Sequence, residues 1–107
     1  MRPIEFRILL SLATGDRHGY AIIQDIRSRA EDAPEVETGT LYRALQRLVE
    51  LELVRPAEPR RSQTDHDERR RYYAITPAGR RAATTEARRM ASLVDSARAA
   101  RLIPGGT

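Results

Sequence analysis

Hydrophobic side chains recur three and four positions apart through the first fifty residues, which is the spacing of helices that bury one side. A first helix is expected over residues 3–14, because Pro3 suits a first helical turn and Gly15 suits a helix end. Its apolar stripe consists of Ile4, Ile8, Leu9 and Leu12. A second helix is expected over residues 18–31, before the break at Pro34. Its stripe consists of Tyr20, Ile23, Ile26 and Ala30.

A third helix is expected to begin at Thr38, a good N-cap residue, and to end near Leu51. Its core-facing stripe consists of Leu41, Leu45, Leu48 and Val49. Its opposite face is polar and carries Thr40, Tyr42, Arg43, Gln46, Arg47 and Glu50. The helix therefore offers one side to a core and the other to solvent or to a polar partner.

Beyond the third helix the pattern becomes that of strands. Residues 53–58 predict a short strand, and residues 59–68 contain no hydrophobic residue and predict a loop. Residues 69–76 alternate with a period of two, which predicts a second strand and hence a hairpin. Thr76 and Pro77 then have the types expected of an N-cap and a first helical position.

The last helix is expected from Pro77 to about Arg101, and its apolar positions repeat as in a coiled coil. These positions are Ala83, Ala87, Met90, Val94 and Ala97. A helix of about 25 residues extends roughly 37 Å, too far to bury its stripe against a small domain. We therefore expect a homodimer. Its interface would also include Ile4, Ile8 and Leu12 of the first helix.

Three helices, a hairpin and a long closing helix predict a mainly helical α+β chain. The order is that of a winged helix-turn-helix with a two-stranded wing and a long C-terminal dimerisation helix. We expect residues 1–76 to form the winged domain, residues 77–102 the dimerisation helix and residues 103–107 a flexible tail.

Length and composition narrow the class of protein. A chain of 107 residues predicts a single domain, and the lack of cysteine excludes disulfides and thiolate metal sites. No apolar run approaches the ~18 residues of a membrane span, so we expect a soluble, cytoplasmic protein without a membrane partner. His18 and His66 lie outside any catalytic or metal-ligand spacing. We expect no catalytic residue, metal or cofactor, and no enzymatic activity.

The positive charge lies in the second half of the chain. The net charge is +4, and every basic residue is an arginine. Residues 1–58 hold 8 arginines against 10 acidic residues, whereas residues 59–107 hold 11 against 5. Such an excess indicates an acidic partner such as nucleic acid, or simply a solvated arginine surface in a genome rich in arginine codons.

The polar face of the third helix favours nucleic acid. An α-helix fits the major groove of DNA, and an arginine such as Arg43 can bind guanine through two hydrogen bonds. The glycine between Thr38 and Thr40 would let the DNA backbone approach closely. In the hairpin, Arg60, Arg61 and three consecutive arginines favour contacts to phosphate, although nearby acids also allow a neutral turn. The candidate DNA-binding residues are Tyr20, Thr38, Gly39, Thr40, Tyr42, Arg43, Gln46, Arg47, Arg69, Arg70, Arg71 and Tyr72. We also expect Tyr20 and Tyr73 to be core residues whose hydroxyls reach the surface.

Several motifs, in order along residues 4–82, resemble those of the PadR family of bacterial transcriptional regulators. They are His18-Gly19-Tyr20, Gly39-Thr40-Leu41-Tyr42-Arg43-Ala44-Leu45 with Leu48, Arg70-Arg71-Tyr72-Tyr73 and Thr76-Pro77-Ala78-Gly79. The resemblance implies a repressor of the short subgroup, which has one C-terminal helix, bound to a near-palindromic double-stranded DNA operator. It also implies a small-molecule effector. The chain has no tryptophan and no aromatic residue after Tyr73. An effector site would therefore use the N-terminal helix, including Phe6, or Met90 and neighbouring aliphatic residues.

Two other functions fit the same fold. A winged helix can be a protein–protein interaction module without specific DNA binding, and fold alone does not decide between them. Such a module would more often expose apolar groups on its third helix. A nonspecific nucleic-acid binder would instead show equal affinity for any duplex and a steep dependence on salt.

Overall fold

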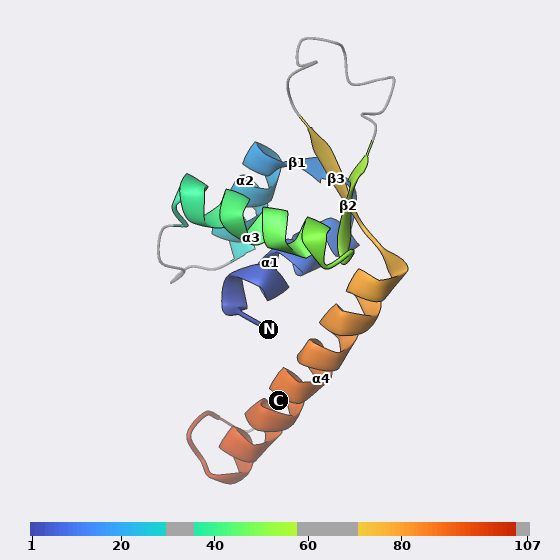
Figure 1. The fold of residues 1–107 in the computed structure, drawn as a ribbon. Coiled ribbons are helices and arrows are strands. Elements are labelled where there is room, and N and C mark those ends of the chain that lie inside the picture. The colour runs from blue at the N-terminus through green and yellow to red at the C-terminus, as the bar shows by residue number, and fades with distance from the viewer. Residues whose placement is uncertain (30–35, 58–70, 105–107) are drawn as a thin grey trace.

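Three helices and a small sheet form the body of the molecule, and a long helix leads away from it (Figure 1). The computed structural model describes residues 1–29, 36–57 and 71–104. The elements are α1 (Pro3–Ala13), β1 (Arg17–His18), α2 (Gly19–Arg29), α3 (Thr38–Glu50), β2 (Val54–Ala57), β3 (Tyr72–Ile75) and α4 (Pro77–Ala99). This is the predicted mainly helical α+β order, with a small antiparallel sheet as the wing and a long C-terminal helix.

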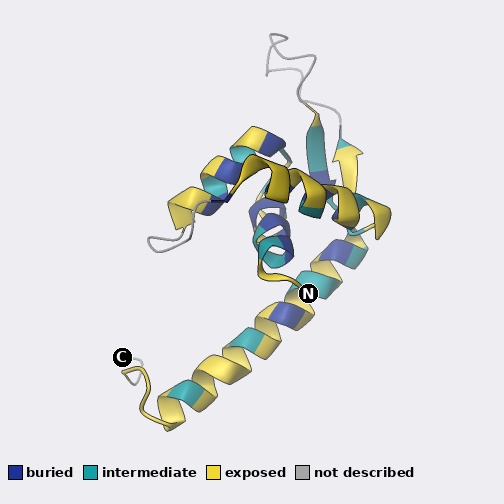
Figure 2. Cartoon of the chain, turned by 60° about the vertical axis from the view of Figure 1, so that its left-hand side comes forward, coloured by how far each residue is buried: buried dark blue, intermediate teal, exposed yellow. Residues whose placement is uncertain are grey.

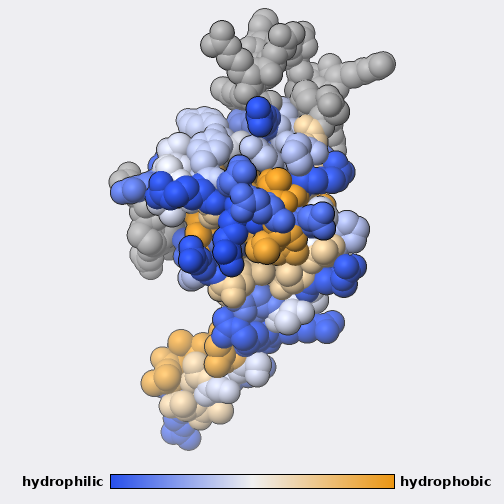
Figure 3. Space-filling model, viewed as in Figure 1, coloured by the Kyte–Doolittle hydropathy of each residue, from blue (hydrophilic) through white to orange (hydrophobic). Residues whose placement is uncertain are grey.

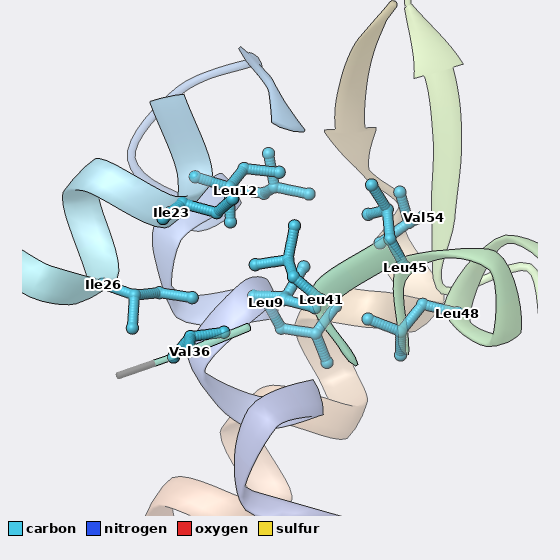
Figure 4. Packing of buried hydrophobic residues seen from close by; sticks show 11 residues of the cluster. Leu9, Leu12, Ile23, Ile26, Val36, Leu41, Leu45, Leu48 and Val54 are labelled. Carbon is cyan, nitrogen blue, oxygen red and sulfur yellow. The ribbon is translucent and has the colours of Figure 1, made fainter. Parts of the chain in front are cut away.

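The core lies between α1, α2 and α3 and is closed by β2 (Figure 4). Its buried members are Ile8, Leu9, Leu12, Ile22, Ile23, Ile26, Val36, Leu41, Leu45, Leu48 and Val54. The predicted stripe of α3 is confirmed at its three leucines. In α2, however, Tyr20 is 53% exposed and was wrongly placed in the core. The buried residues of that helix are Gly19, Ile22, Ile23 and Ile26. Tyr20 follows Gly19 and so points about 100° away from it around the helix axis.

The sheet has three antiparallel strands in the order β1-β3-β2. The hairpin was predicted, but β1 was not, because two residues are too few for a period-two pattern. In β1, Arg17 lies opposite Tyr73 and His18 lies opposite Tyr72. Pro56 is tolerated in β2 because that strand is at the edge of the sheet.

Thr76 joins the sheet to α4. Its hydroxyl donates to the carbonyl of Glu52 (2.7 Å) and accepts from the backbone N–H of Gly79 (2.9 Å), which confirms it as the N-cap. The backbone here is so close that a Cβ on Gly79 would lie 2.1 Å from the carbonyl oxygen of Leu53. The Thr-Pro-x-Gly sequence therefore fixes the point at which α4 leaves the sheet.

Most of α4 lies outside the body of the molecule. Only Gly79 and Glu86 are buried in this helix, and its surface is largely exposed beyond them (Figure 2). Hydrophobic side chains gather at its far end (Figure 3), where Leu93 is 57% exposed and Leu102 is 77% exposed. Within the described residues, no helix combines the length and apolar character needed to cross a membrane.

Two predicted helix ends need correction. Thr38 is the first residue of α3 rather than its N-cap, because Glu37 occupies the N-cap position and makes no side-chain capping bond. The C-cap of α1 is Thr14, and Gly15 follows it.

Candidate nucleic-acid interface

The outward face of α3 is polar and exposed. All seven of its candidate residues are exposed, namely Thr38, Gly39, Thr40, Tyr42, Arg43, Gln46 and Arg47 (Figure 2). They are exposed because Leu41, Leu45 and Leu48 anchor the other side of the helix in the core. A helix held in this way can enter a major groove without uncovering apolar surface.

Arg43 lies near the N-terminal end of this face. Its Nη2 atom is 3.4 Å from the hydroxyl of Thr40, which is a long contact between two exposed groups. Its guanidinium also passes over Gly39, where a Cβ would lie 3.4 Å from Nη1. This cation therefore has donors available for a ligand and stands beside the helix N-terminus, which itself favours anions.

Tyr42 of α3 also contacts α2. Its ring lies over Gly19, and a Cβ on that glycine would be 2.4 Å from the Tyr42 hydroxyl oxygen. Next to Gly19, His18 accepts a hydrogen bond at Nδ1 from the backbone N–H of Ala21 (3.1 Å) and so caps α2. The rings of His18 and Tyr72 pack in a T-shaped arrangement with their centroids 5.4 Å apart. This contact connects the start of α2 to the wing.

Arg47 makes an ion pair within the chain. Its Nε atom lies 2.9 Å from Oε2 of Glu5, a residue of α1 that is only 4% exposed. The predicted DNA-binding arginine at the C-terminal end of α3 is therefore held against α1.

The described part of the wing adds Arg71, which is exposed, and Tyr72, which is half-buried. The predicted contacts Arg69 and Arg70, and the loop residues Arg60, Arg61 and His66, lie outside the described residues. Across residues 1–29, 36–57 and 71–104, no group of three histidine or acidic side chains could hold a metal ion.

Comparison with known proteins identifies the family. Residues 8–85 match the model of the transcriptional regulator PadR-like family. The chain belongs to this family. Membership places it among transcriptional regulators rather than enzymes, and the winged helix-turn-helix fold is that of the family.

The PadR-like chain is also similar to individual proteins in sequence and in fold. An uncharacterized 37.1 kDa protein in transposon TN4556 of Streptomyces fradiae is 40% identical over 86 residues, which are 80% of this chain and 22% of that protein. The chain thus spans about a fifth of this relative. A PadR family transcription regulator from Clostridium difficile has a TM-score of 0.75 and 24% identity, covering 89% of this chain and 94% of that one. Bacillus subtilis PadR in complex with operator DNA has a TM-score of 0.66 and 18% identity, over 79% and 45% of the two chains.

The dimer residues predicted for this PadR-like chain fall into three groups by burial. Ile8 and Leu12 are fully buried in the chain's own core, so they have almost no surface with which to contact a second chain. Ile4 and Ala83 pack against that core and are partly buried. Farther along α4, Ala87 and Val94 are exposed and Met90 and Ala97 are half-buried, which leaves them available to a second chain. Leu93, which was not among the predicted residues, is more exposed than Val94.

The sequence analysis also missed Glu5 and Gly19. Glu5 carries a readable signal, because it lies three residues before Ile8 and is a charged residue on the apolar stripe of its helix. A charge on such a stripe requires a partner once it is buried. No pattern along the chain could reveal that the partner is Arg47, since the pair joins residues more than forty positions apart.

Proposed function

We propose that this PadR-like chain is a sequence-specific DNA-binding repressor that acts as a homodimer on a near-palindromic operator. The observation that carries the proposal is the outward face of α3, where Arg43 is exposed among hydroxyl and amide groups while the leucines behind it are buried. An arginine presented on a rigid helix can read guanine in the major groove. The exposed Arg71 of the wing would contact phosphate beside that groove.

The dimer is supported by α4. This helix has 23 residues, and its exposed Leu93 and Val94 lie beyond the part that packs on α1. Exposed aliphatic side chains on an isolated helix favour burial against another helix. A two-fold symmetric pair would place its two α3 helices in successive major grooves, about 34 Å apart. A dimer lying across a promoter would exclude polymerase.

A small-molecule effector is supported by an open groove of about 320 Å³ between α1, α2 and α4. Its apolar walls include Phe6, Leu10, Ile26 and Met90, and Arg7 and Arg29 also line it. Both residues named from the sequence, Phe6 and Met90, are among them. Arg29 is paired with Asp25 at 3.0 Å. Apolar walls beside the Arg7 guanidinium suit an aromatic or aliphatic anion, whose binding would weaken the hold on DNA.

The alternative function, a protein-interaction module, has less support. Such a module would expose apolar side chains on α3, yet Tyr42 is the one large hydrophobic residue exposed there among the described residues.

Selection of bound duplexes from a random DNA pool tests the proposal. We expect enrichment of a sequence with two-fold symmetry and half-sites about one helical turn apart. Enrichment of an asymmetric sequence would contradict the dimer geometry. No enrichment, with weak and equal binding to all duplexes, would contradict specific DNA binding.

A further inference from the structure

Glu5 is a buried carboxylate with two partners. It lies in the first turn of α1, where its Oε1 atom accepts a hydrogen bond from the backbone N–H of Arg2 at 3.0 Å. Its Oε2 atom lies 2.9 Å from the Nε of Arg47 in an ion pair that lacks the alignment of a hydrogen bond. A carboxylate that is only 4% exposed needs such partners, because burial of an unpaired charge is costly.

The two arginines of α3 are therefore in different states. Among the residues that the structure describes, Arg43 has only the long contact to Thr40, between two exposed groups. Arg47 is one turn farther along the same helix and is still 55% exposed, but a carboxylate neutralises its charge and orients its guanidinium toward α1. A neutralised arginine adds little to the attraction of the helix for phosphate, which depends on free positive charge.

We propose that Glu5 is a specificity-determining residue that withholds Arg47 from DNA. With Arg47 paired, contact at this end of α3 depends on the hydrogen-bonding groups of Gln46. With Arg47 released, the same helix would gain a cation able to bind the phosphate of any sequence. Glu5 thus lowers nonspecific affinity and leaves specific binding to Arg43. This inference rests on the proposed binding of DNA.

The test is the salt dependence of DNA binding by the full chain. Glu5→Gln keeps an oxygen that can accept from the Arg2 N–H but removes the negative charge. We expect it to tighten binding to a scrambled duplex several-fold at low salt, and to lower the preference for the selected operator. The plot of log affinity against log salt should steepen by about 0.9, the value of one additional phosphate contact.

Three further variants separate this effect from a change in net charge or in folding. Glu86→Gln makes the same charge change at a carboxylate paired with Arg89 on α4, and should leave the slope unchanged. Glu5→Gln/Arg47→Gln should return to the wild-type slope. Arg47→Gln alone should also keep that slope, and it tests the inference even if Glu5→Gln folds poorly. Circular dichroism checks that each variant is folded.

The possible results distinguish failure of the Glu5–Arg47 proposal from failure of the proposed DNA binding. A slope that becomes shallower by about 0.9 in Arg47→Gln would show that Arg47 already binds phosphate, and would overturn the inference. An unchanged slope in a folded Glu5→Gln protein would do the same. A wild-type protein that binds no duplex would instead overturn the proposed function, and the inference with it.

Discussion

The ring of Tyr42 rests directly on Gly19, so that α3 contacts the first turn of α2 at the edge of the exposed α3 face. A Cβ at Gly19 would lie 2.4 Å from the Tyr42 hydroxyl oxygen and 2.7 Å from two of its ring carbons. Tyr42 is 44% exposed, so its ring has room to turn outward. The side chain at position 19 therefore determines where this tyrosine points.

Gly19→Ala should weaken operator binding more than it changes stability. The added methyl group would push the Tyr42 ring off α2, while alanine remains favourable in a helix. We expect a loss of about tenfold in affinity for the selected operator, or about 1.4 kcal/mol. The check is a double-mutant cycle: in a Tyr42→Ala background, Gly19→Ala should have no further effect. An equal loss in both backgrounds would show that Gly19 acts independently of Tyr42.

Arg43→Ala should cost about 1–3 kcal/mol of operator affinity and relax the preference for one base pair. Arg43 is the arginine of α3 that no carboxylate of the described residues holds, so it can make two hydrogen bonds to guanine. Fluorescence anisotropy with the operator and its single-base variants measures both effects. Arg88→Ala, which removes an exposed arginine from α4, is the control and should change neither. Unchanged operator binding by Arg43→Ala would remove the base-reading role.

Arg71→Ala should lower affinity by the same factor for operator and scrambled duplexes. Arg71 is exposed directly before β3. With α3 in the major groove, we expect Arg71 to reach a phosphate beside the groove rather than the edge of a base. The slope of log affinity against log salt should become shallower by about 1. A loss confined to the operator would assign Arg71 to base reading instead.

The sequence predicted the elements well because each has a local signal. The leucines of α3 recur at helical spacing and are buried as expected, and Thr76 has the residue type and position of an N-cap. Predictions failed where the structure depends on contacts between distant segments. The two residues of β1 form a strand only because β3 lies beside them, and Arg47 is drawn to α1 by Glu5.

The candidate site was predicted as a face rather than as a set of contacts. Helical spacing correctly placed Arg43 and Arg47 on the exposed side of α3. It could not show that one of them is paired and the other is not, because the pairing depends on the packing of α1 against α3. Ile8 and Leu12 illustrate the same limit: their spacing marks them as buried, but not whether a second chain or their own core covers them.

Gly79→Ala should destabilise the fold by about 1–3 kcal/mol, the usual cost of forcing a group into a packed site. The new methyl group would meet the carbonyl oxygen of Leu53 at 2.1 Å, a backbone atom that cannot turn aside. Urea unfolding without DNA measures the change. Gly39→Ala is the matched control, since its nearest neighbour is the flexible Arg43 guanidinium at 3.4 Å. It should be neutral or stabilising by up to about 1 kcal/mol, because alanine favours helix over glycine. Equal destabilisation by both changes would contradict the role of the Leu53 contact.

Leu93→Glu should convert the protein to a monomer. Leu93 is 57% exposed on α4 beside Val94, and a carboxylate there would lose its hydration when a second α4 covers it. Sedimentation velocity at micromolar concentration should show a dimer for the wild type and a monomer for the variant. Ser92→Glu is the control, because Ser92 is exposed about 100° around the helix from Leu93, on the side away from Met90 and Ala97. It adds the same charge and should remain dimeric.

The monomeric Leu93→Glu variant should also lose affinity for a two-half-site operator while keeping its weak binding to a single half-site, because only the dimer engages both sites at once. A wild type that sediments as a monomer would contradict the proposed interface.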